Sequence, residues 1–229
     1  MRGLFVTGTD TGVGKTVLSA ALAAALVAAG EPVRAFKPVV TGLDGSGDGE
    51  GGWPADHVLL GMAAGMAPKE VSPLRYAPAV SPHLAAEMAG EQIEPRELLA
   101  AAAASVQAGQ TLIAEGVGGL LVPLRVDYSV CDFALALGLP VLIAARTGLG
   151  TINHTLLTLQ LARAAGLEVR AVVLTPWPRE PTLLEHSNRA TIARVGEVEV
   201  QGLSAVAGPE AAELARAGRE LPWRRWLQG

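Results

Sequence analysis

The stretch 3–22 constrains the fold of this chain more than any other part of the sequence. It begins with an apolar run, passes through a glycine-rich loop at 8–14 and continues as an alanine-rich segment that starts with Lys15 and Thr16. A strand, a glycine-rich loop and a helix in this order are typical of a phosphate-binding loop, in which backbone N–H groups and the helix N-terminus face phosphate oxygens. We therefore expect a nucleotide to bind here.

The residues of this loop have expected roles that follow from that geometry. Lys15 would reach the β- and γ-phosphates, and the Thr16 hydroxyl would ligate Mg²⁺. The outer glycine, Gly8, lies one residue earlier than in the strict motif, which has glycine where this chain has Thr9. We expect the nucleotide to contact Asp10, Thr11, Gly12, Val13, Gly14, Lys15, Thr16 and Val17.

Composition limits the partners of this 229-residue chain. Half of the residues are hydrophobic, 17% are charged and the net charge is −4 without a basic run, so a large core is available and no nucleic-acid partner is expected. No apolar run is long enough to span a membrane and no signal peptide follows Met1, so we expect no membrane partner and a cytoplasmic protein. The single Cys131 cannot form an internal disulfide and is expected to be buried.

Strands and helices alternate along the chain. The segments expected as strands are 32–37, 111–115, 139–145 and 169–174, and those expected as helices include 15–29, 95–108, 182–195 and 210–218. This alternation predicts the α/β class, with a mostly parallel sheet flanked by helices, as in P-loop NTPases and Rossmann-like proteins. We expect one doubly wound domain that covers residues 1–229.

Three further residues extend the expected nucleotide site. Lys37 ends a short strand, and open α/β sheets bind ligands at the carboxyl ends of their strands. Glu115 ends an apolar strand and is expected to bind Mg²⁺ with Thr16, unless it is an ordinary strand-end acid. Asp56 begins a helix after the glycine-rich loop 42–55. It is either an N-cap alone or a third Mg²⁺ ligand.

A second helix start further along the chain is an expected anion site. The strand at 139–145 is followed by Gly148 and Gly150, and a helix begins at Thr151. No lysine follows, so we expect this helix start to bind a carboxylate or phosphate of a second substrate, rather than a second nucleotide. After the next strand, residues 175–177 lie where a purine could pack, which makes Thr175 and Trp177 candidate nucleotide contacts.

These features together predict an ATP-dependent phosphoryl transfer onto a small anionic acceptor. Such a transfer depends on positioning and on charge stabilisation, and it needs no nucleophilic side chain. Lys37 is placed to hold the oxyanion of the acceptor.

The chain also resembles the dethiobiotin synthetase family over essentially its whole length. Five ordered motifs carry this resemblance, and together they are far more specific than the phosphate loop alone. They are Thr7 to Thr16, Lys37 to Gly42, Ser81 to Ala86, Glu115 to Leu124 and Gly150 to Thr155.

The resemblance implies a homodimer that uses Mg²⁺ and ATP to close the ureido ring of dethiobiotin from 7,8-diaminononanoate and CO₂ or bicarbonate. One amine takes up CO₂ as a carbamate, ATP phosphorylates it, and the neighbouring amine displaces phosphate. It gives catalytic roles to Lys37, Lys15 and Thr11, and places the distant carboxylate of the substrate at the second helix start, across the dimer interface. The implied substrate contacts are Thr41, which meets the carbamate with Lys37, and Pro82, Gly118, Gly150, Thr151, Ile152 and Asn153.

Two positions depart from the pattern of the family. Relatives often have an acidic residue where this chain has Gly12, and an asparagine that contacts the adenine edge where it has Thr175. A site that contacts the base edge weakly also discriminates weakly between bases. We therefore expect a relaxed nucleotide preference.

Other interpretations remain open at this stage. A partition- or division-type ATPase switch shares the expected fold, but that class has a signature lysine early in the loop, where this chain has Asp10 and Thr11. A small-molecule kinase that releases a phosphorylated product is a second alternative. The tail at 222–227, rich in Trp and Arg, is expected to pack on the domain and not to anchor it to a membrane.

Overall fold

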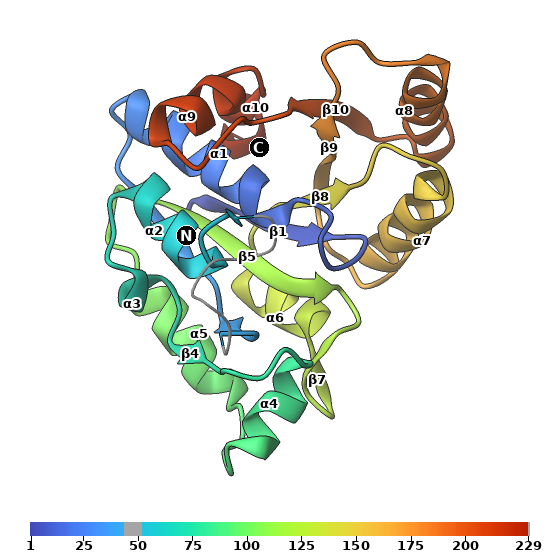
Figure 1. The fold of residues 1–229 in the computed structure, drawn as a ribbon. Helices are drawn as coiled ribbons and strands as arrows, with labels where there is room; N and C mark the ends of the chain where they lie inside the picture. Colours follow the sequence, from blue (N-terminus) through green and yellow to red (C-terminus); the bar gives the residue numbers. More distant parts are fainter. Residues whose placement is uncertain (44–51, 229) are drawn as a thin grey trace.

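The structure is a computed structural model that describes residues 1–43 and 52–228. At its centre, six strands form a sheet in which every neighbouring pair is parallel, in the order β10-β9-β8-β1-β5-β2 (Figure 1). These strands are β1 (Gly3–Gly8), β2 (Val33–Phe36), β5 (Thr111–Gly119), β8 (Val141–Ala145), β9 (Val169–Trp177) and β10 (Glu199–Ser204). The α/β fold class and the parallel sheet predicted from the sequence are confirmed.

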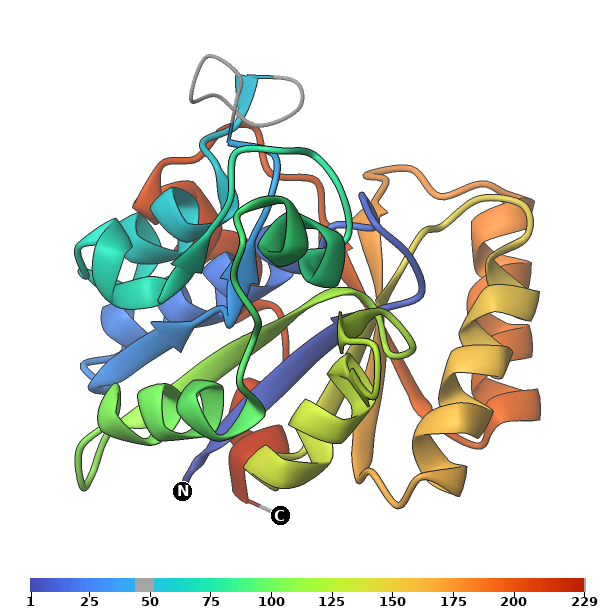
Figure 2. The same cartoon turned by 90° about the horizontal axis from the view of Figure 1, so that it is seen from below.

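Helices cover both faces of this sheet (Figure 2). One hydrophobic layer contains α1 (Lys15–Ala28), α2 (Asp56–Ala64), α9 (Ala211–Arg219) and α10 (Trp223–Gln228). The other contains α5 (Pro95–Ala104), α6 (Val130–Leu137), α7 (Thr151–Ala164) and α8 (Leu183–Gly196). Side chains of a strand alternate between the layers, so Leu4 and Val6 of β1 join the first layer while Phe5 joins the second. Burial on both faces explains why these strands are continuously apolar.

Two small sheets and two short helices complete the fold. Strand β3 (Val39–Val40) pairs in parallel with β4 (Leu74–Arg75), and β6 (Pro123–Arg125) forms an antiparallel pair with β7 (Tyr128–Ser129). The short helices are α3 (Pro68–Val71) and α4 (Pro82–Met88). Proline at the first position of each helix suits a turn whose N–H groups lack intrahelical partners.

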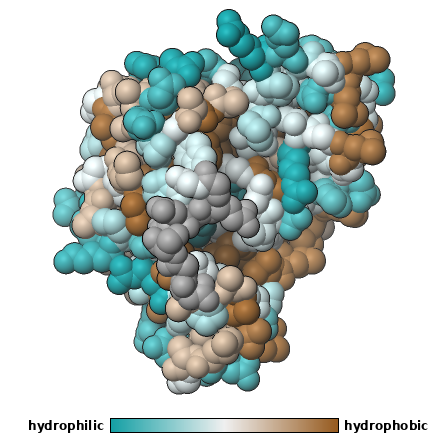
Figure 3. Space-filling model, in the orientation of Figure 1, coloured by the Kyte–Doolittle hydropathy of each residue, from teal (hydrophilic) through white to brown (hydrophobic). Residues whose placement is uncertain are grey.

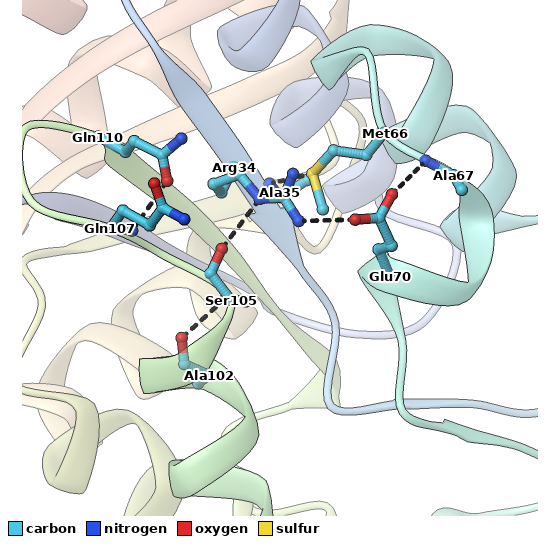
Figure 4. A network of polar contacts seen from close by, with 9 residues as sticks. All are labelled: Arg34, Ala35, Met66, Ala67, Glu70, Ala102, Ser105, Gln107 and Gln110. Carbon is cyan, nitrogen blue, oxygen red and sulfur yellow. Dashed lines mark hydrogen bonds and ion pairs between the residues drawn. The ribbon is translucent and has the colours of Figure 1, made fainter.

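Polar contacts of Arg34 brace the edge strand β2 (Figure 4). Its Nε donates to the Ser105 carbonyl at 2.9 Å, and its Nη2 lies 3.2 Å from Glu70 Oε1 on α3. The other oxygen of Glu70 accepts from the Ala67 N–H at 2.9 Å. These contacts connect β2 to segments on both sides, and they hold the strand that leads directly into Lys37.

Some boundaries differ from the sequence-based expectations. The helix expected to reach residue 108 ends at Ala104, and β10 was not predicted at all. Strand β5 does not end at Glu115 but continues to Gly119, which pairs with Gly8 of β1 after a shift in register. Most of the loop expected at 42–55 lies outside the described residues.

The C-terminal tail packs on the domain as predicted. Trp223 and Trp226 are only 3% and 2% exposed, and the Trp226 indole N–H donates to Glu199 Oε2 at 3.3 Å. Cys131 is buried in α6, also as predicted. Within residues 1–43 and 52–228, no helix combines the length and the apolar character that a membrane span needs.

Candidate active site

The phosphate loop joins β1 to α1 at the carboxyl edge of the sheet. Gly12 and Gly14 have φ angles of 68° and 87°, a left-handed conformation that favours glycine. A Cβ at Gly14 would also lie 2.7 Å from Thr175 Cγ2, so this glycine has no room for a side chain. In the described chain no side chain caps α1, which leaves its N-terminal N–H groups available to an anion.

Lys15 lies along this loop with its ammonium on the inner side. The residue is 6% exposed, and its Nζ donates to the Asp10 carbonyl at 2.8 Å. Burial and, secondarily, the charge of Lys37 lower the pKa of Lys15 to about 8. A phosphate bound in the loop would place a negative charge next to this buried ammonium and would favour its protonated form.

Four side chains from separate parts of the chain meet beneath the loop. Lys37 Nζ lies 2.6 Å from Asp56 Oδ2 and 2.5 Å from Glu115 Oε1. Thr16 Oγ1 lies 2.8 Å from Asp56 Oδ1 and 2.9 Å from the same oxygen of Glu115. The structure thus brings together the three residues proposed from sequence as Mg²⁺ ligands, and it places the proposed catalytic lysine among them.

The charges in this cluster compensate each other. Burial alone would lower the pKa of Lys37, whose side chain is 4% exposed, but Asp56 and Glu115 outweigh burial and raise that pKa above its ordinary value. Burial likewise opposes ionisation of Asp56, yet the charge of Lys37 and hydrogen bonds from Lys37 and Thr16 lower its pKa. The lysine is therefore held as a cation and Asp56 as an anion.

The donor set fits a magnesium ion. Magnesium prefers oxygen ligands and usually keeps several waters and phosphate oxygens in its shell, so a protein need supply only one or two carboxylates and a hydroxyl. Within the described residues, Glu115 Oε2 is buried without a hydrogen-bond partner, and such an oxygen is costly unless a cation or donor meets it. No group of three or more His, Cys, Asp or Glu side chains suited to a metal occurs in the described ranges, so this set rests on two carboxylates and one hydroxyl.

The N-cap alternative for Asp56 is wrong. Ala55 occupies the N-cap position of α2, and Asp56 is the first helical residue. Its carboxylate points away from the α2 backbone, toward Thr16 and Lys37, because those two partners offer it a hydroxyl and a full positive charge.

The glycine-rich end of β5 lies against the phosphate loop. A Cβ at Gly118 would be 3.5 Å from Thr11 Oγ1, and one at Gly119 would be 3.4 Å from the Gly8 carbonyl oxygen. Two residues proposed from sequence, Thr11 and Gly118, are therefore neighbours on the rim of the site. Gly116 instead packs beside Phe5, so the glycines of this run serve core packing as well as access.

The segment between β4 and α4, which leads into Pro82, lies against Gly42, the residue after Thr41. The Gly42 N–H donates to the Pro78 carbonyl at 3.0 Å, and a Cβ at Gly42 would be 3.4 Å from the Ala79 Cβ. The Thr41 side chain remains half-buried, while Pro82 is buried at the start of α4. The segment 76–82 therefore lies beside the residues that follow Lys37 and borders the candidate active site on that side.

The second proposed anion site is the N-terminus of α7. Gly150 is its N-cap with a φ of 89°, and no side chain caps this end in the part of the chain that the structure describes. Thr151 does not offer its hydroxyl to a ligand, since Oγ1 donates to the Arg146 carbonyl at 2.6 Å. Of the four residues proposed here, Thr151 also has its backbone N–H bonded, to the Gly148 carbonyl at 3.3 Å, while Ile152 is half-buried and Asn153 is exposed.

Two residues near α7 were missed by sequence reasoning. Asn188 on α8 is 4% exposed, and its Nδ2 donates to the carbonyls of Thr147 and Gly148 at 2.9 and 3.2 Å. Arg146 Nη2 lies 3.2 Å from Asp10 Oδ2 and 3.4 Å from the Thr11 carbonyl oxygen, so it connects the α7 loop to the phosphate loop. Asn188 lies four residues before the apolar Ile192, and this spacing places both on one helix face, which could have predicted that Asn188 points inward. No local sequence pattern could have predicted the contact of Arg146 with the phosphate loop.

The two proposed base contacts have different surroundings. Thr175 is 3% exposed and packs on Gly14 of the phosphate loop. The Trp177 ring lies against Gly202 of β10, where a Cβ would be 2.6 Å from the indole Cγ, and the Arg189 guanidinium lies 5.5 Å from its centroid. Contact of Trp177 with a purine stays a prediction, and only the uncovered part of the ring is available for it.

Comparison with known proteins identifies the family. A family model described as an AAA domain matches residues 2–203. The ATP-dependent dethiobiotin synthetase BioD of Anaeromyxobacter dehalogenans (strain 2CP-C) is 40% identical over 96% of each chain, and that of Mycobacterium sp. (strain KMS) is 38% identical over 100% of this chain and 99% of its own. The solved ParA family ATPase from Chlorobium tepidum TLS has a TM-score of 0.56 at 13% identity, over 96% of this chain and 98% of that chain, and this likeness concerns the fold alone. The two relatives cover nearly all of the sequence and confirm the resemblance seen in the motifs, and the chain belongs to the ATP-dependent dethiobiotin synthetase family.

Proposed function

We propose that this protein is the ATP-dependent ligase that closes the ureido ring of dethiobiotin in biotin biosynthesis. Its substrates would be 7,8-diaminononanoate, CO₂ and a nucleoside triphosphate, with Mg²⁺ as cofactor. It would act as a cytoplasmic homodimer in which residues 1–229 form one domain. Family membership supports the ligase activity.

The proposed reaction balances in three steps. One amine of the substrate adds to CO₂ and loses a proton, which gives a carbamate. A carbamate oxygen attacks the γ-phosphorus and ADP leaves, which gives a carbamic-phosphoric anhydride. The neighbouring amine then attacks the carbonyl carbon, inorganic phosphate leaves with its electron pair, and loss of a proton completes the cyclic urea.

The residues of this chain would contribute position and charge. The N–H groups of the phosphate loop and the Lys15 ammonium would hold the triphosphate, while Lys37 and the Thr41 hydroxyl would hold the carbamate in line with the γ-phosphorus. Bound through Thr16, Asp56 and Glu115, Mg²⁺ would neutralise charge that develops on the phosphate oxygens. No nucleophilic side chain is required.

The far end of the substrate would lie at the N-terminus of α7. Backbone N–H groups at Gly150, Ile152 and Asn153 suit a carboxylate, and the helix dipole favours it. We propose that this end binds across a dimer interface. Leu149, just before α7, Leu157 on α7 and Leu183 on α8 are 92%, 57% and 85% exposed and offer an apolar surface that a second copy would cover; separate brown spots lie at the upper right edge of Figure 3.

The base of the nucleotide would lie between the ends of β9 and β10. The Ala205 N–H donates to the Trp177 carbonyl at 3.2 Å, so the loop after β10 lies beside residues 175–177 at the same edge of the sheet as Gly14. With a threonine at 175, no amide is available there to contact the base edge, which favours the relaxed nucleotide preference expected from the sequence.

The observation that carries this proposal is the position of Lys37. Its buried ammonium contacts Asp56 and Glu115, the two carboxylates that Thr16 also contacts at the end of the phosphate loop, and phosphoryl transfer to an oxyanion needs a positive charge near the phosphates.

One incubation tests the proposed function against its alternatives. The protein is mixed with 7,8-diaminononanoate, bicarbonate, Mg²⁺ and ATP, and products are followed by mass spectrometry and a phosphate assay. The synthetase releases inorganic phosphate and a cyclic urea in equal amounts. A product that keeps a phosphoryl group would instead indicate a small-molecule kinase, and equal ATP hydrolysis without the diamine would indicate an ATPase switch.

A further inference from the structure

Lys37 occupies the position of a cation between two carboxylates. Its Nζ lies within 2.6 Å of both Asp56 Oδ2 and Glu115 Oε1, and the lysine side chain is only 4% exposed. These are two of the three residues assigned to Mg²⁺ in the proposed function. The same carboxylates therefore have one positive partner already in place.

Glu115 shows why this site needs a cation. Its side chain is 0% exposed, and its Oε1 contacts both Lys37 and Thr16 while Oε2 is buried without a partner in the described chain. A fully buried carboxylate with water excluded needs a cation, since an unpaired buried charge is strongly unfavourable. In this structure Lys37 is the cation that meets Oε1, while Oε2 stays without a partner in the described residues.

We propose that Lys37 is the resident counter-ion of the metal site and that Mg²⁺ binds there only as the ammonium moves out. The proposal rests on the proposed metal site of Thr16, Asp56 and Glu115. Two carboxylates balance one ammonium and the charge of Lys15 nearby, so adding two further positive charges with Lys37 unmoved would set like charges side by side.

The residue type suits such an exchange. Lysine has a compact ammonium on a flexible four-carbon stem, so it can leave one anionic partner for another by rotating its own bonds. The chain has only three lysines among its 18 basic residues, Lys15, Lys37 and Lys69, and it places two of them in this site. An arginine at 37 would hold the two carboxylates in a rigid fork and would not release them as readily.

The exchange has a consequence for the order of events. While the carboxylates hold Lys37, its charge is not available to an acceptor. Once metal and nucleotide occupy the site, Lys37 points its charge at the carbamate beside the γ-phosphate. Phosphate transfer would thereby be prevented until the nucleotide and its metal are both present.

Lysine-selective NMR tests the movement directly. Protein labelled with ¹³C at the lysine ε-carbon gives three signals, which Lys37→Met and Lys69→Met variants assign by loss of one signal each. Wild type is titrated with Mg²⁺ in the presence of ADP and in the absence of the diamine. We expect a saturable shift of the Lys37 signal on Mg²⁺ addition, beyond the change caused by ADP alone, and no shift of exposed Lys69.

Metal affinity gives a second, independent measurement. Mn²⁺ binding without nucleotide, followed by electron paramagnetic resonance, should tighten at least about tenfold in Lys37→Met, because the competing ammonium is gone, and should not change in Lys69→Met. A Lys37 signal that stays in place while Mn²⁺ binds equally well to wild type and Lys37→Met overturns the exchange, although the ligase reaction would stand. Absence of saturable metal binding in all three proteins, both without nucleotide and with ADP, overturns both the exchange and the proposed metal site.

Discussion

Replacing Lys37 with methionine removes one positive charge and nearly preserves side-chain volume. The ammonium now compensates Asp56 and Glu115, whose side chains are 42% and 0% exposed. In the variant Asp56 can turn toward water, but Glu115 cannot. The variant should therefore be less stable than wild type and also inactive.

The two effects have separate magnitudes. Breaking a buried ion pair by removing one partner costs about 3–5 kcal/mol, and we take about 3 kcal/mol because Asp56 is partly solvated. For a domain of this size that corresponds to a fall in Tm of roughly 6–12 °C. Loss of one charge that stabilises the transition state should lower kcat by at least about 100-fold.

Differential scanning calorimetry and steady-state release of inorganic phosphate measure these effects. Lys69→Met is the matched control, since exposed Lys69 on α3 should contribute within about 0.5 kcal/mol. If Tm fell by less than about 2 °C, Glu115 would not depend on Lys37 for compensation. Near-normal kcat in a folded variant would remove Lys37 from the mechanism.

Three further measurements address other parts of the molecule. Asn188→Asp keeps the shape of the side chain but removes the Nδ2 donor to the carbonyls of Thr147 and Gly148, so KM for the diamine should rise about tenfold with kcat little changed. A fall in kcat alone would contradict positioning of the α7 N-terminus by Asn188. Because burial, with a contribution from Asp132, raises the pKa of the Cys131 thiol, Ellman's reagent should react with it only after urea unfolds the chain, and rapid reaction of the native protein would contradict the packing of α6. With a threonine at 175 in the proposed base site, turnover with ATP, CTP and GTP should agree within about tenfold, and strict dependence on ATP would refute the relaxed preference.

The sequence predicted those features that depend on neighbours along the chain. Glycines at 12 and 14 with Lys15 and Thr16 define a strand, a loop and a helix locally, and the structure has all three in place. Periodicity and apolar runs also identified most strands, because a strand buried on both faces is apolar throughout. Strand β10 (Glu199–Ser204) escaped prediction because its burial is mixed and its residues include Gln201 and Gly202.

The parts that sequence could not predict depend on contacts between distant segments. An aspartate that starts a helix fits both a cap and a metal ligand, and only the fold decides, because it brings Lys37 and Thr16 to the Asp56 carboxylate. The role of Arg146 likewise depends on how close the loop after β8 comes to the phosphate loop. Propensity describes local alternatives, while tertiary contacts decide between them.

The pairing of Arg146 with Asp10 bears on how one fold serves different reactions. Partition-type switches have a lysine early in the phosphate loop, whereas this chain has a carboxylate, and a carboxylate beside a triphosphate would repel it. Arg146 Nη2 lies 3.2 Å from Asp10 Oδ2, and the pair is well exposed, with 62% and 57% of the two side chains accessible. Such a pair adds little stability, so its effect is to cancel the charge of Asp10 and to direct that side chain toward the loop that leads into α7.

The ParA family ATPase shares the fold at a TM-score of 0.56, and a shared fold does not by itself imply a shared function. In this chain the charged side chains on the loops at the carboxyl edge of the sheet are paired, Arg146 with Asp10 and Lys37 with Asp56 and Glu115, and we expect such charges, more than the backbone, to decide the reaction.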